Sequence, residues 1–186
     1  MDSKNKEKAK LYTKFPISSV LIYDSVTTLH YLAGGFGIIL GYIFSWIGIL
    51  FGLIYFLFAF VQMYILMPLW VCPNCVYYRL EDSRCVSGLN KISKKIAKEG
   101  NPDDFPKRGE GVLCYNNIYM ASFFIPIIAI IPALILNFSF LVLGLLLSVI
   151  GLLVFRFFVI FPKIACLHCN AKYKCPVAEK IGVCDK

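Results

Sequence analysis

The chain has 186 residues, of which 59% are hydrophobic and 16% are charged, and its mean hydropathy is +0.71. Soluble domains carry about 25% charged residues, so this composition excludes an ordinary soluble protein and indicates an integral membrane protein. The formal net charge of +8 raises the question of nucleic-acid binding, but no interleaving of aromatic and basic residues supports that class of function.

The sequence holds two long stretches without Asp, Glu, Lys or Arg, at residues 25–78 and 111–155. Each stretch is long enough for two helices of about 20 residues, the length that crosses a bilayer. We therefore predict an all-α integral membrane protein with four transmembrane helices, arranged as two repeated hairpins that are each followed by a cytoplasmic cysteine-rich knuckle. The predicted spans are Tyr31–Trp46, Leu50–Val71, Ile118–Leu136 and Phe140–Phe161. The first of them is short, so it could begin earlier, within residues 17–30, or cross only part of the bilayer.

The distribution of cations predicts how the chain is oriented. Of the 19 Lys and Arg residues, five precede Pro16, eight lie between Arg79 and Arg108, and five lie from Lys163 onward, whereas the two predicted hairpin turns carry no charge. The positive-inside rule therefore places both termini and the middle loop of this multi-pass cell-membrane protein in the cytoplasm. In chain order we expect a basic N-terminus (1–16), an amphipathic leading segment with the first hairpin (17–71), a cysteine loop with an amphipathic helix (72–117), a second hairpin (118–162) and a cysteine tail (163–186).

Residues 18–35, "SSVLIYDSVTTLHYLAGG", place several polar groups over two turns of a predicted helix. The candidate polar-site residues are Tyr23, Asp24, Thr28, His30 and Tyr31, with Thr27 nearby. If this segment enters the bilayer, Asp24 and His30 are costly to bury and indicate a site for a quinone, a lipid headgroup or a proton. If it lies at the interface, the same residues are ordinary solvated groups.

Few other residues inside the predicted spans are polar. Arg156 is the only cation there, about a turn and a half from the end of its span, and we expect its side chain to snorkel to the interface. Glycine recurs on these helices and indicates that they approach one another closely. The glycines concerned are Gly34, Gly35, Gly37, Gly41, Gly48, Gly52, Gly144 and Gly151.

Two apolar stretches end in the same pattern, Pro-x3-Cys-x2-Cys, in "PLWVCPNC" at 68–75 and in "PKIACLHC" at 162–169. A Phe-Pro pair precedes each predicted hairpin, at 15–16 and at 105–106. These features predict an internal duplication whose halves cross the membrane in the same direction, related by an axis near the bilayer normal. The alternative is that proline and cysteine recur by chance at helix ends.

All eight cysteines fall on the predicted cytoplasmic side, in two groups of four. The first group is Cys72, Cys75, Cys85 and Cys114, and the second is Cys166, Cys169, Cys175 and Cys184. Because disulfides are disfavoured in the cytoplasm, these thiolates are available as metal ligands, and four of them make a tetrahedral zinc site. We therefore predict two zinc sites, with iron–sulfur clusters as the alternative cofactor and disulfides or free thiols as a third reading.

Two positions in these groups have more than one interpretation. Cys114 lies 29 residues after Cys85, so it is either a ligand or a plain buried thiol. His168 lies inside the tail knuckle, between Cys166 and Cys169, where it is either a substitute ligand or a solvated neighbour.

The loop segment "SGLNKISKKIAKEG" at 87–100 predicts a short amphipathic helix. Leu89, Ile92 and Ile96 fall on one helical face. The candidate lipid-headgroup residues around the other face are Lys91, Lys94, Lys95 and Lys98. Either the helix lies in the headgroup layer with its lysines on anionic lipid, or it packs on the metal knuckle and exposes the lysines to water.

Residues 72–92, "CPNCVYYRLEDSRCVSGLNKI", combine Cys-x2-Cys-x-Tyr-Tyr with a third cysteine, Cys85, and with Gly88. This segment resembles one found in a group of uncharacterised prokaryotic four-span membrane proteins. The resemblance implies that the loop is a recurring unit, and it implies no activity, ligand or partner.

Enzymatic functions find little support in the sequence, and we assign no catalytic residue. There is no Ser/His/Asp set, phosphate loop or zincin motif, and zinc with four cysteine ligands leaves no open position for a substrate. A reactive thiol is disfavoured because both Cys-x2-Cys motifs follow helix C-termini, where the helix dipole opposes a thiolate.

Three non-enzymatic functions remain. The first is an accessory or scaffolding subunit of a membrane assembly that carries the two metal sites. The second is an iron–sulfur electron-transfer subunit, and the third is a small transporter or lipid-handling protein with structural metal. The expected partners are membrane lipid and either further copies of the chain or a larger membrane complex, because short turns leave much apolar helix surface uncovered.

Overall fold

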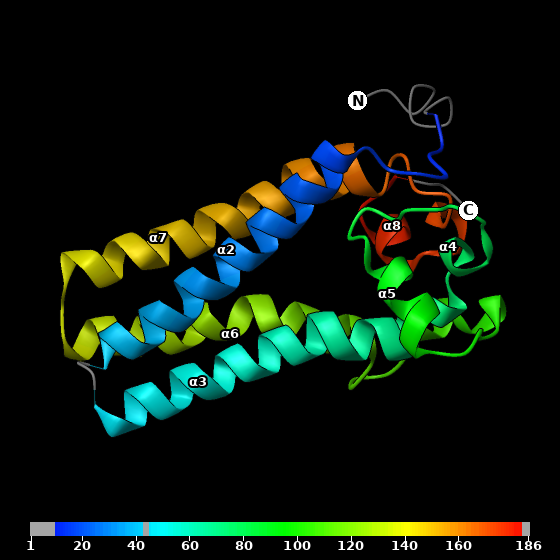
Figure 1. Ribbon diagram of the computed structural model, residues 1–186. Helices are drawn as coiled ribbons and strands as arrows, with labels where there is room; N and C mark the ends of the chain where they lie inside the picture. Colours follow the sequence, from blue (N-terminus) through cyan, green and yellow to red (C-terminus); the bar gives the residue numbers. More distant parts are fainter. Residues whose placement is uncertain (1–9, 43–44, 184–186) are drawn as a thin grey trace.

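The computed structural model describes residues 10–42 and 45–183, and within these residues it contains helices but no β-strand. Four long helices lie side by side as a bundle (Figure 1). They are α2 (Ile17–Gly41), α3 (Trp46–Val61), α6 (Tyr115–Leu136) and α7 (Phe140–Phe155). The prediction of an all-α fold is confirmed for the part of the chain that is described.

Shorter elements follow α3 and α7 and fill the loop between the hairpins. They are η1 (Gln62–Val71), η2 (Cys72–Asn74), α4 (Val76–Arg79), α5 (Leu89–Ile96), η3 (Pro102–Asp104), η4 (Pro106–Gly109), η5 (Arg156–Ala165), η6 (Lys172–Lys174) and α8 (Pro176–Lys180). In Figure 1, α4, α5 and α8 gather at one end of the bundle, and the turn between α6 and α7 lies at the opposite end. We call residues 10–16, 72–114 and 166–183 the cap.

Three of the helices are long and apolar enough to cross a membrane: Trp46–Asn74, Tyr115–Leu136 and Phe140–Ala165. Their outer faces carry exposed apolar side chains, among them Leu57 and Ile128, which are each 67% exposed. An uncovered apolar surface of this extent is typical of a protein that lies in lipid.

Tryptophan marks both ends of the second helix of the bundle. Trp46 is 88% exposed at the start of α3, and Trp70 is 58% exposed near the end of η1. The two lie 24 positions apart, which is roughly 35 Å along a helix and slightly more than the ~30 Å hydrocarbon core of a bilayer. Exposed tryptophan at both interfaces is typical of a membrane span.

The remaining long helix, α2, differs from the predicted first span at both ends. The prediction of Tyr31–Trp46 is wrong, because α2 begins at Ile17 and ends at Gly41, and α3 begins at Trp46. The alternative start within residues 17–30 agrees with the structure: Pro16 precedes the helix, and neither proline nor glycine interrupts it before Gly34. Because α2 packs against α3, α6 and α7, it occupies the centre of the bundle.

Glycine allows the helices of the bundle to approach closely. A Cβ atom at Gly52 of α3 would lie only 2.3 Å from Ile39 Cγ1 of α2. Other glycines of the bundle whose Cβ would lie under 3.0 Å from a neighbouring residue are Gly34, Gly35, Gly37, Gly41 and Gly48. The same role predicted for Gly144 and Gly151 is wrong, because a Cβ atom at either position would meet nothing within 4 Å.

Both hairpins end in a ten-residue π-helical segment with a proline at its seventh position. Segment η1 contains Pro68 and segment η5 contains Pro162. Because proline has no N–H to donate and its ring crowds the carbonyl four residues earlier, the helix widens there. Each segment stops directly before a cysteine, so the widened turn sets the direction in which the Cys-x2-Cys motif leaves the bundle.

Candidate functional site

Both Cys-x2-Cys motifs fold as tight turns directly after η1 and η5. The amide of Cys75 donates to the carbonyl of Cys72 at 3.1 Å, and the amide of Cys169 donates to the carbonyl of Cys166 at 3.3 Å. Each turn therefore keeps the two cysteines of its motif close together.

The N-terminal segment before α2 holds the loop and the tail next to each other. The amide of Tyr12 donates to the carbonyl of His168 at 2.9 Å, and the Tyr77 hydroxyl donates to the carbonyl of Tyr12 at 2.6 Å. The same hydroxyl accepts a hydrogen bond from the amide of Asn170 at 3.2 Å. Since Tyr77 is 1% exposed, its bonds join two distant parts of the sequence in a setting shielded from water.

Six of the cysteines line one cavity of about 170 Å³ where the cap meets the bundle. They are Cys72, Cys75 and Cys85 from the loop, and Cys166, Cys169 and Cys175 from the tail. Much of the remaining wall is apolar or aromatic, with Met63, Met67 and Phe161 on the side of the bundle. The structure therefore places cysteines that the sequence divides into two separate groups around the same space.

Burial disfavours the charged form of the cavity thiols. It raises the pKa of Cys75 to about 11 and that of Cys169 to about 12, because a thiolate is poorly solvated there. The neighbouring thiols of Cys85 and Cys175 raise both pKa values further, whereas Arg108 acts in the opposite direction on Cys75. A metal ion that binds these sulfurs has to displace their protons.

Two cations line the same cavity. The Arg108 Nη2 group donates to Cys175 Sγ at 2.9 Å, and its guanidinium lies 4.3 Å from the centroid of the Phe105 ring. Lys172 is 2% exposed, and its amino group lies 5.0 Å from the centroid of the Tyr173 ring. Positive charge in the wall favours an anionic occupant.

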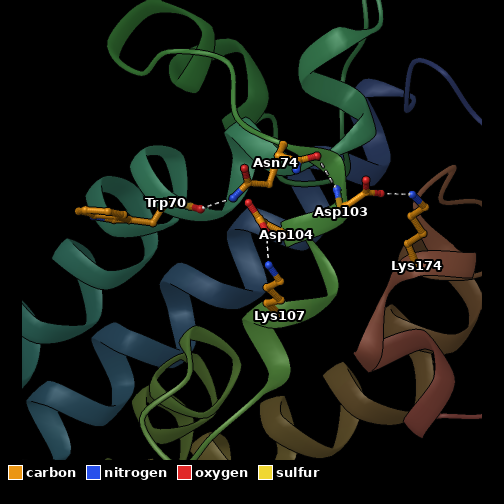
Figure 2. A network of polar contacts seen from close by, with 7 residues as sticks. Trp70, Asn74, Asp103, Asp104, Lys107 and Lys174 are labelled. Atoms are coloured by element: carbon orange, nitrogen blue, oxygen red, sulfur yellow. Dashed lines mark hydrogen bonds and ion pairs between the residues drawn. The ribbon is translucent and has the colours of Figure 1, made fainter.

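Polar contacts outside the cavity fix the segment that carries Arg108 (Figure 2). Asp103 forms an ion pair of 3.0 Å with Lys174 of the tail, which also lowers the pKa of Asp103. In the first knuckle, the Asn74 side chain donates to the carbonyl of Trp70 at 3.1 Å. Loop and tail are therefore connected on the outer side of the cavity as well.

The thiols do not form a closed ligand set as they stand. Within residues 10–42 and 45–183, no three His, Cys, Asp or Glu side chains form a group that could hold a metal ion. The seven cysteines in this part of the chain form no disulfide with one another. The six cysteines surround the cavity, but no three of their sulfurs are arranged around one possible metal position.

Three of the predicted ligand positions are not among these six. Cys114 is buried at the start of α6, where its Sγ accepts a hydrogen bond from the Asn117 amide at 3.4 Å, and it does not line the cavity. Cys184 lies outside the described residues. His168 stacks on Tyr12 with 4.6 Å between ring centroids, so its ring faces the N-terminal segment.

Three predicted polar residues of α2 are buried against α6. The Tyr23 and Tyr119 hydroxyls share a hydrogen bond of 2.9 Å, and the Tyr31 hydroxyl lies 3.0 Å from Ser122 Oγ. His30 Nε2 lies 3.2 Å from a backbone carbonyl of α6. These contacts place the polar groups inside the bundle and away from its outer surface.

The other two predicted residues, Asp24 and Thr28, are half-buried. Thr28 Oγ1 lies 3.3 Å from the Tyr64 hydroxyl of η1. Asp24 Oδ1 is buried and has no hydrogen-bond partner. Thr28 thus faces η1, whereas the first three residues face α6, so the predicted polar residues do not share one partner element.

Sequence reasoning missed the centre of this polar cluster, which is Arg156. Its side chain is 1% exposed, so the predicted snorkelling is wrong. The guanidinium donates to Thr27 Oγ1 at 2.5 Å and to the Tyr119 hydroxyl. The aromatic rings around it are those of Tyr23, Tyr119, Phe123 and Phe161, with centroids between 4.5 and 5.5 Å away. Its position well inside a span, where an unpaired cation is costly, is the signal that could have indicated an inward side chain.

The predicted amphipathic helix of the loop is present as α5, but its apolar residues do not share one environment. Leu89 is 4% exposed, whereas Ile92 and Ile96 are 43% and 51% exposed. The four candidate headgroup residues, Lys91, Lys94, Lys95 and Lys98, are exposed as well. The outer face of α5 therefore combines two isoleucines with lysines.

A buried asparagine anchors α5 next to the cavity. Asn90 Nδ2 donates to the carbonyls of Ser83 at 3.1 Å and of Tyr77 at 3.3 Å. Its Oδ1 accepts a hydrogen bond from the amide of Cys85 at 3.0 Å. The position of Cys85 in the cavity wall therefore depends on the position of α5.

Comparison of the chain with protein-family models, curated proteins and solved structures finds no match. The resemblance of residues 72–92 to uncharacterised four-span membrane proteins stays a prediction.

Proposed function

We propose that the protein is a non-catalytic, multi-pass membrane protein whose cysteine cavity binds a thiophilic metal. The observation that carries the proposal is that six cysteines, from segments far apart in the sequence, line one cavity. Soft thiolate ligands select zinc and the iron of iron–sulfur clusters over hard cations such as magnesium. A metal bound there would join the exits of both hairpins and stabilise the cap on the bundle.

The proposal includes four membrane spans, with α2 as the fourth. The 25 residues of α2 extend over roughly 38 Å, which exceeds the thickness of the hydrocarbon core. Its polar side chains are tolerated in the bilayer because they pack against α6 and η1. Since the cations gather in the cap and the hairpin turns are uncharged, the cap belongs on the cytoplasmic side.

Internal duplication is part of the same proposal. Segments η1 and η5 are both ten residues long, and both place their proline at the seventh position. Their first residues, Gln62 and Arg156, are equivalent in position, and each is 1% exposed. Chance recurrence of proline and cysteine would not be expected to reproduce the same buried polar position.

The metal is zinc in the first candidate function, in which the protein is a scaffolding or accessory subunit of a membrane assembly. Zinc with thiolate ligands is redox-inactive and structural. The exposed apolar faces of α3 and α7 leave surface for lipid, for further copies of the chain or for a larger partner.

The second candidate function is electron transfer through an iron–sulfur cluster. Thiolates on one zinc ion, each about 2.3 Å from the metal, have to lie about 4 Å apart. No three potential ligands among the described residues form a group that could hold one metal ion. A cluster is larger than one ion and holds its thiolates further apart, so it could engage cysteines that are spread around the cavity wall.

Elemental analysis and an absorbance spectrum of protein purified without oxygen test the proposal. Zinc without visible absorbance is the result expected for the scaffolding function. Iron with labile sulfide and broad visible absorbance is expected for electron transfer. Protein that retains its helical structure and contains no metal would contradict both candidates.

A further inference from the structure

We propose that the two halves of the chain share one metal centre, held by two thiolates from the loop and two from the tail. The ligands are Cys75, Cys85, Cys169 and Cys175, and Arg108 is the cation that stabilises the anionic centre. This inference rests on the proposed metal-binding function. It differs from the expectation from sequence spacing, which assigns one complete site to each half.

The choice of these four thiols follows from their neighbours. Cys75, Cys169 and Cys175 all pack against one small apolar cluster of Val71, Phe105 and Ala171, where the cap meets the bundle. Cys85 lines the same cavity, within electrostatic reach of Cys75 and Cys169 as well as of Cys72. Loop and tail thiols are therefore neighbours in one cavity wall.

The first cysteine of each knuckle contacts a different apolar cluster. Cys72 and Cys166 both pack with the main apolar core, which extends through the bundle and which Cys175 also contacts. An anionic metal centre is least stable next to such an apolar core. The second cysteine of each knuckle packs against the smaller cluster, whose Phe105 ring lies 4.3 Å from the Arg108 guanidinium.

Arg108 supplies the charge that such a centre needs. A divalent ion with four thiolates has a net charge of about −2. The Arg108 guanidinium already donates to Cys175 Sγ at 2.9 Å, and its Nε is buried without a hydrogen-bond partner. Hydrogen bonds and positive charge around ligating sulfurs stabilise the metal-bound form.

Side-chain rotation completes the centre. Each ligand sulfur turns about a single Cα–Cβ bond between staggered rotamers. The backbones that carry the sulfurs are already fixed, Cys85 by Asn90 and Cys169 by its pairing with Tyr12. We therefore expect metal binding to move the thiols of these residues.

Single serine variants separate one shared centre from two independent sites. We expect Cys75→Ser and Cys169→Ser each to lose all of the metal, although each changes only one half. Cys114→Ser is the matched control: that cysteine is buried outside the cavity, and serine also caps a helix N-terminus. Cys114→Ser is therefore expected to retain the wild-type metal content.

Alkylation of the wild-type protein gives the same answer without any substitution. Chelation should make Cys75, Cys85, Cys169 and Cys175 reactive toward a maleimide as one group, and should leave the reactivity of Cys114 unchanged.

In chelator competition, Arg108→Gln should lower the affinity for metal at least tenfold. Its neighbour Lys107, which is exposed and pairs with Asp104, is the control as Lys107→Gln.

The outcomes distinguish this inference from the function on which it rests. Wild-type protein without metal would overturn the proposed function. Two centres per chain, of which Cys75→Ser and Cys169→Ser each remove one, would keep the proposed function and overturn the sharing. Equal metal affinity of Arg108→Gln and Lys107→Gln would overturn the role of Arg108.

Discussion

At the scale of single residues, Arg156 is the least expected feature of the bundle. A guanidinium inside a membrane span is costly unless its surroundings compensate for lost hydration. Here the compensation comes from two hydroxyl acceptors and four aromatic rings, and no carboxylate among the described residues forms an ion pair with it. Because Thr27 belongs to α2 and Tyr119 to α6, Arg156 connects both hairpins near their cap ends.

Replacing Arg156 by lysine should therefore destabilise the protein although it keeps the charge. A lysine ammonium has no planar fork with which to reach Thr27 and Tyr119 together, and it stacks less well on aromatic rings. We expect the free energy of unfolding to fall by about 2–3 kcal/mol. Thermal unfolding in detergent measures the loss, and Lys163→Arg, an exposed exchange on the same segment, is the control. A melting temperature within error of wild type would show that the packing around position 156 does not depend on the geometry of a guanidinium.

At the scale of elements, close packing depends on a few glycines of α2 and α3. Gly52 leaves just enough room for Ile39, whose Cγ1 would lie 2.3 Å from an added Cβ. Gly151 on α7 has open space around the same position. Both residues lie in helices that are long and apolar enough to cross a membrane, so they differ chiefly in what surrounds them.

Alanine should destabilise the protein at Gly52 but not at Gly151. We expect Gly52→Ala to cost about 1–3 kcal/mol through overpacking against α2. Gly151→Ala adds a better helix former without a clash and should be neutral or slightly stabilising. Thermal unfolding of both variants in the same detergent is the measurement. Equal destabilisation would contradict the observed packing of α2 on α3.

A second element, α5, presents lysines beside exposed Ile92 and Ile96 at the cap end of the bundle. Its inner face is fixed by Asn90, so the outer face has a defined orientation. An apolar pair among lysines is typical of a helix that lies in the headgroup layer of an anionic membrane.

Neutralising the lysines of α5 should weaken the retention of anionic lipid. We expect a variant with Lys91, Lys94, Lys95 and Lys98 all changed to Gln to bind labelled phosphatidylserine at least tenfold less, since each lysine contributes about 1 kcal/mol. Fluorescence transfer from the protein to the lipid measures this in mixed nanodiscs. Lys180→Gln, on α8, shows what the loss of one positive charge elsewhere in the cap does, and Lys91→Gln alone is its matched single variant on α5. Unchanged retention of phosphatidylserine would indicate that these lysines face water and do not contact lipid.

The elements that the sequence predicts well are those set by local pattern. Charge-free stretches predict the long helices, and the Cys-x2-Cys motifs predict tight turns after them. Tertiary packing decides the rest: α2 extends back to Ile17, and its polar residues find partners on α6, η1 and η5. Arg156 turns inward because α2 and α6 offer it acceptors and rings, and residue spacing carries no information about those partners.

At the scale of the whole molecule, the site depends on contacts between distant parts of the chain. Spacing along the sequence predicts one metal site in each half, because it cannot show that the N-terminal segment joins loop and tail. In the structure Tyr77 makes this connection by bonding to Tyr12 and Asn170. The six-cysteine cavity is therefore a tertiary feature.

Removing the Tyr77 hydroxyl should loosen the cap. Tyr77→Phe leaves the carbonyl of Tyr12 and the amide of Asn170 without this partner, at a cost of about 1–3 kcal/mol. Tyr173→Phe, at an exposed position, should have no effect. Hydrogen exchange of residues 10–16 and 166–175 reports the loosening directly. Wild-type protection in Tyr77→Phe would mean that the cap is held by other contacts.

The central claim is that the cysteine cavity holds a metal centre, and native mass spectrometry of wild-type protein tests it most directly. The protein is purified without oxygen and released from detergent in the gas phase as an intact chain. We predict a mass that exceeds that of the polypeptide by one zinc ion or by one iron–sulfur cluster. A folded chain with the mass of the polypeptide alone would contradict the account.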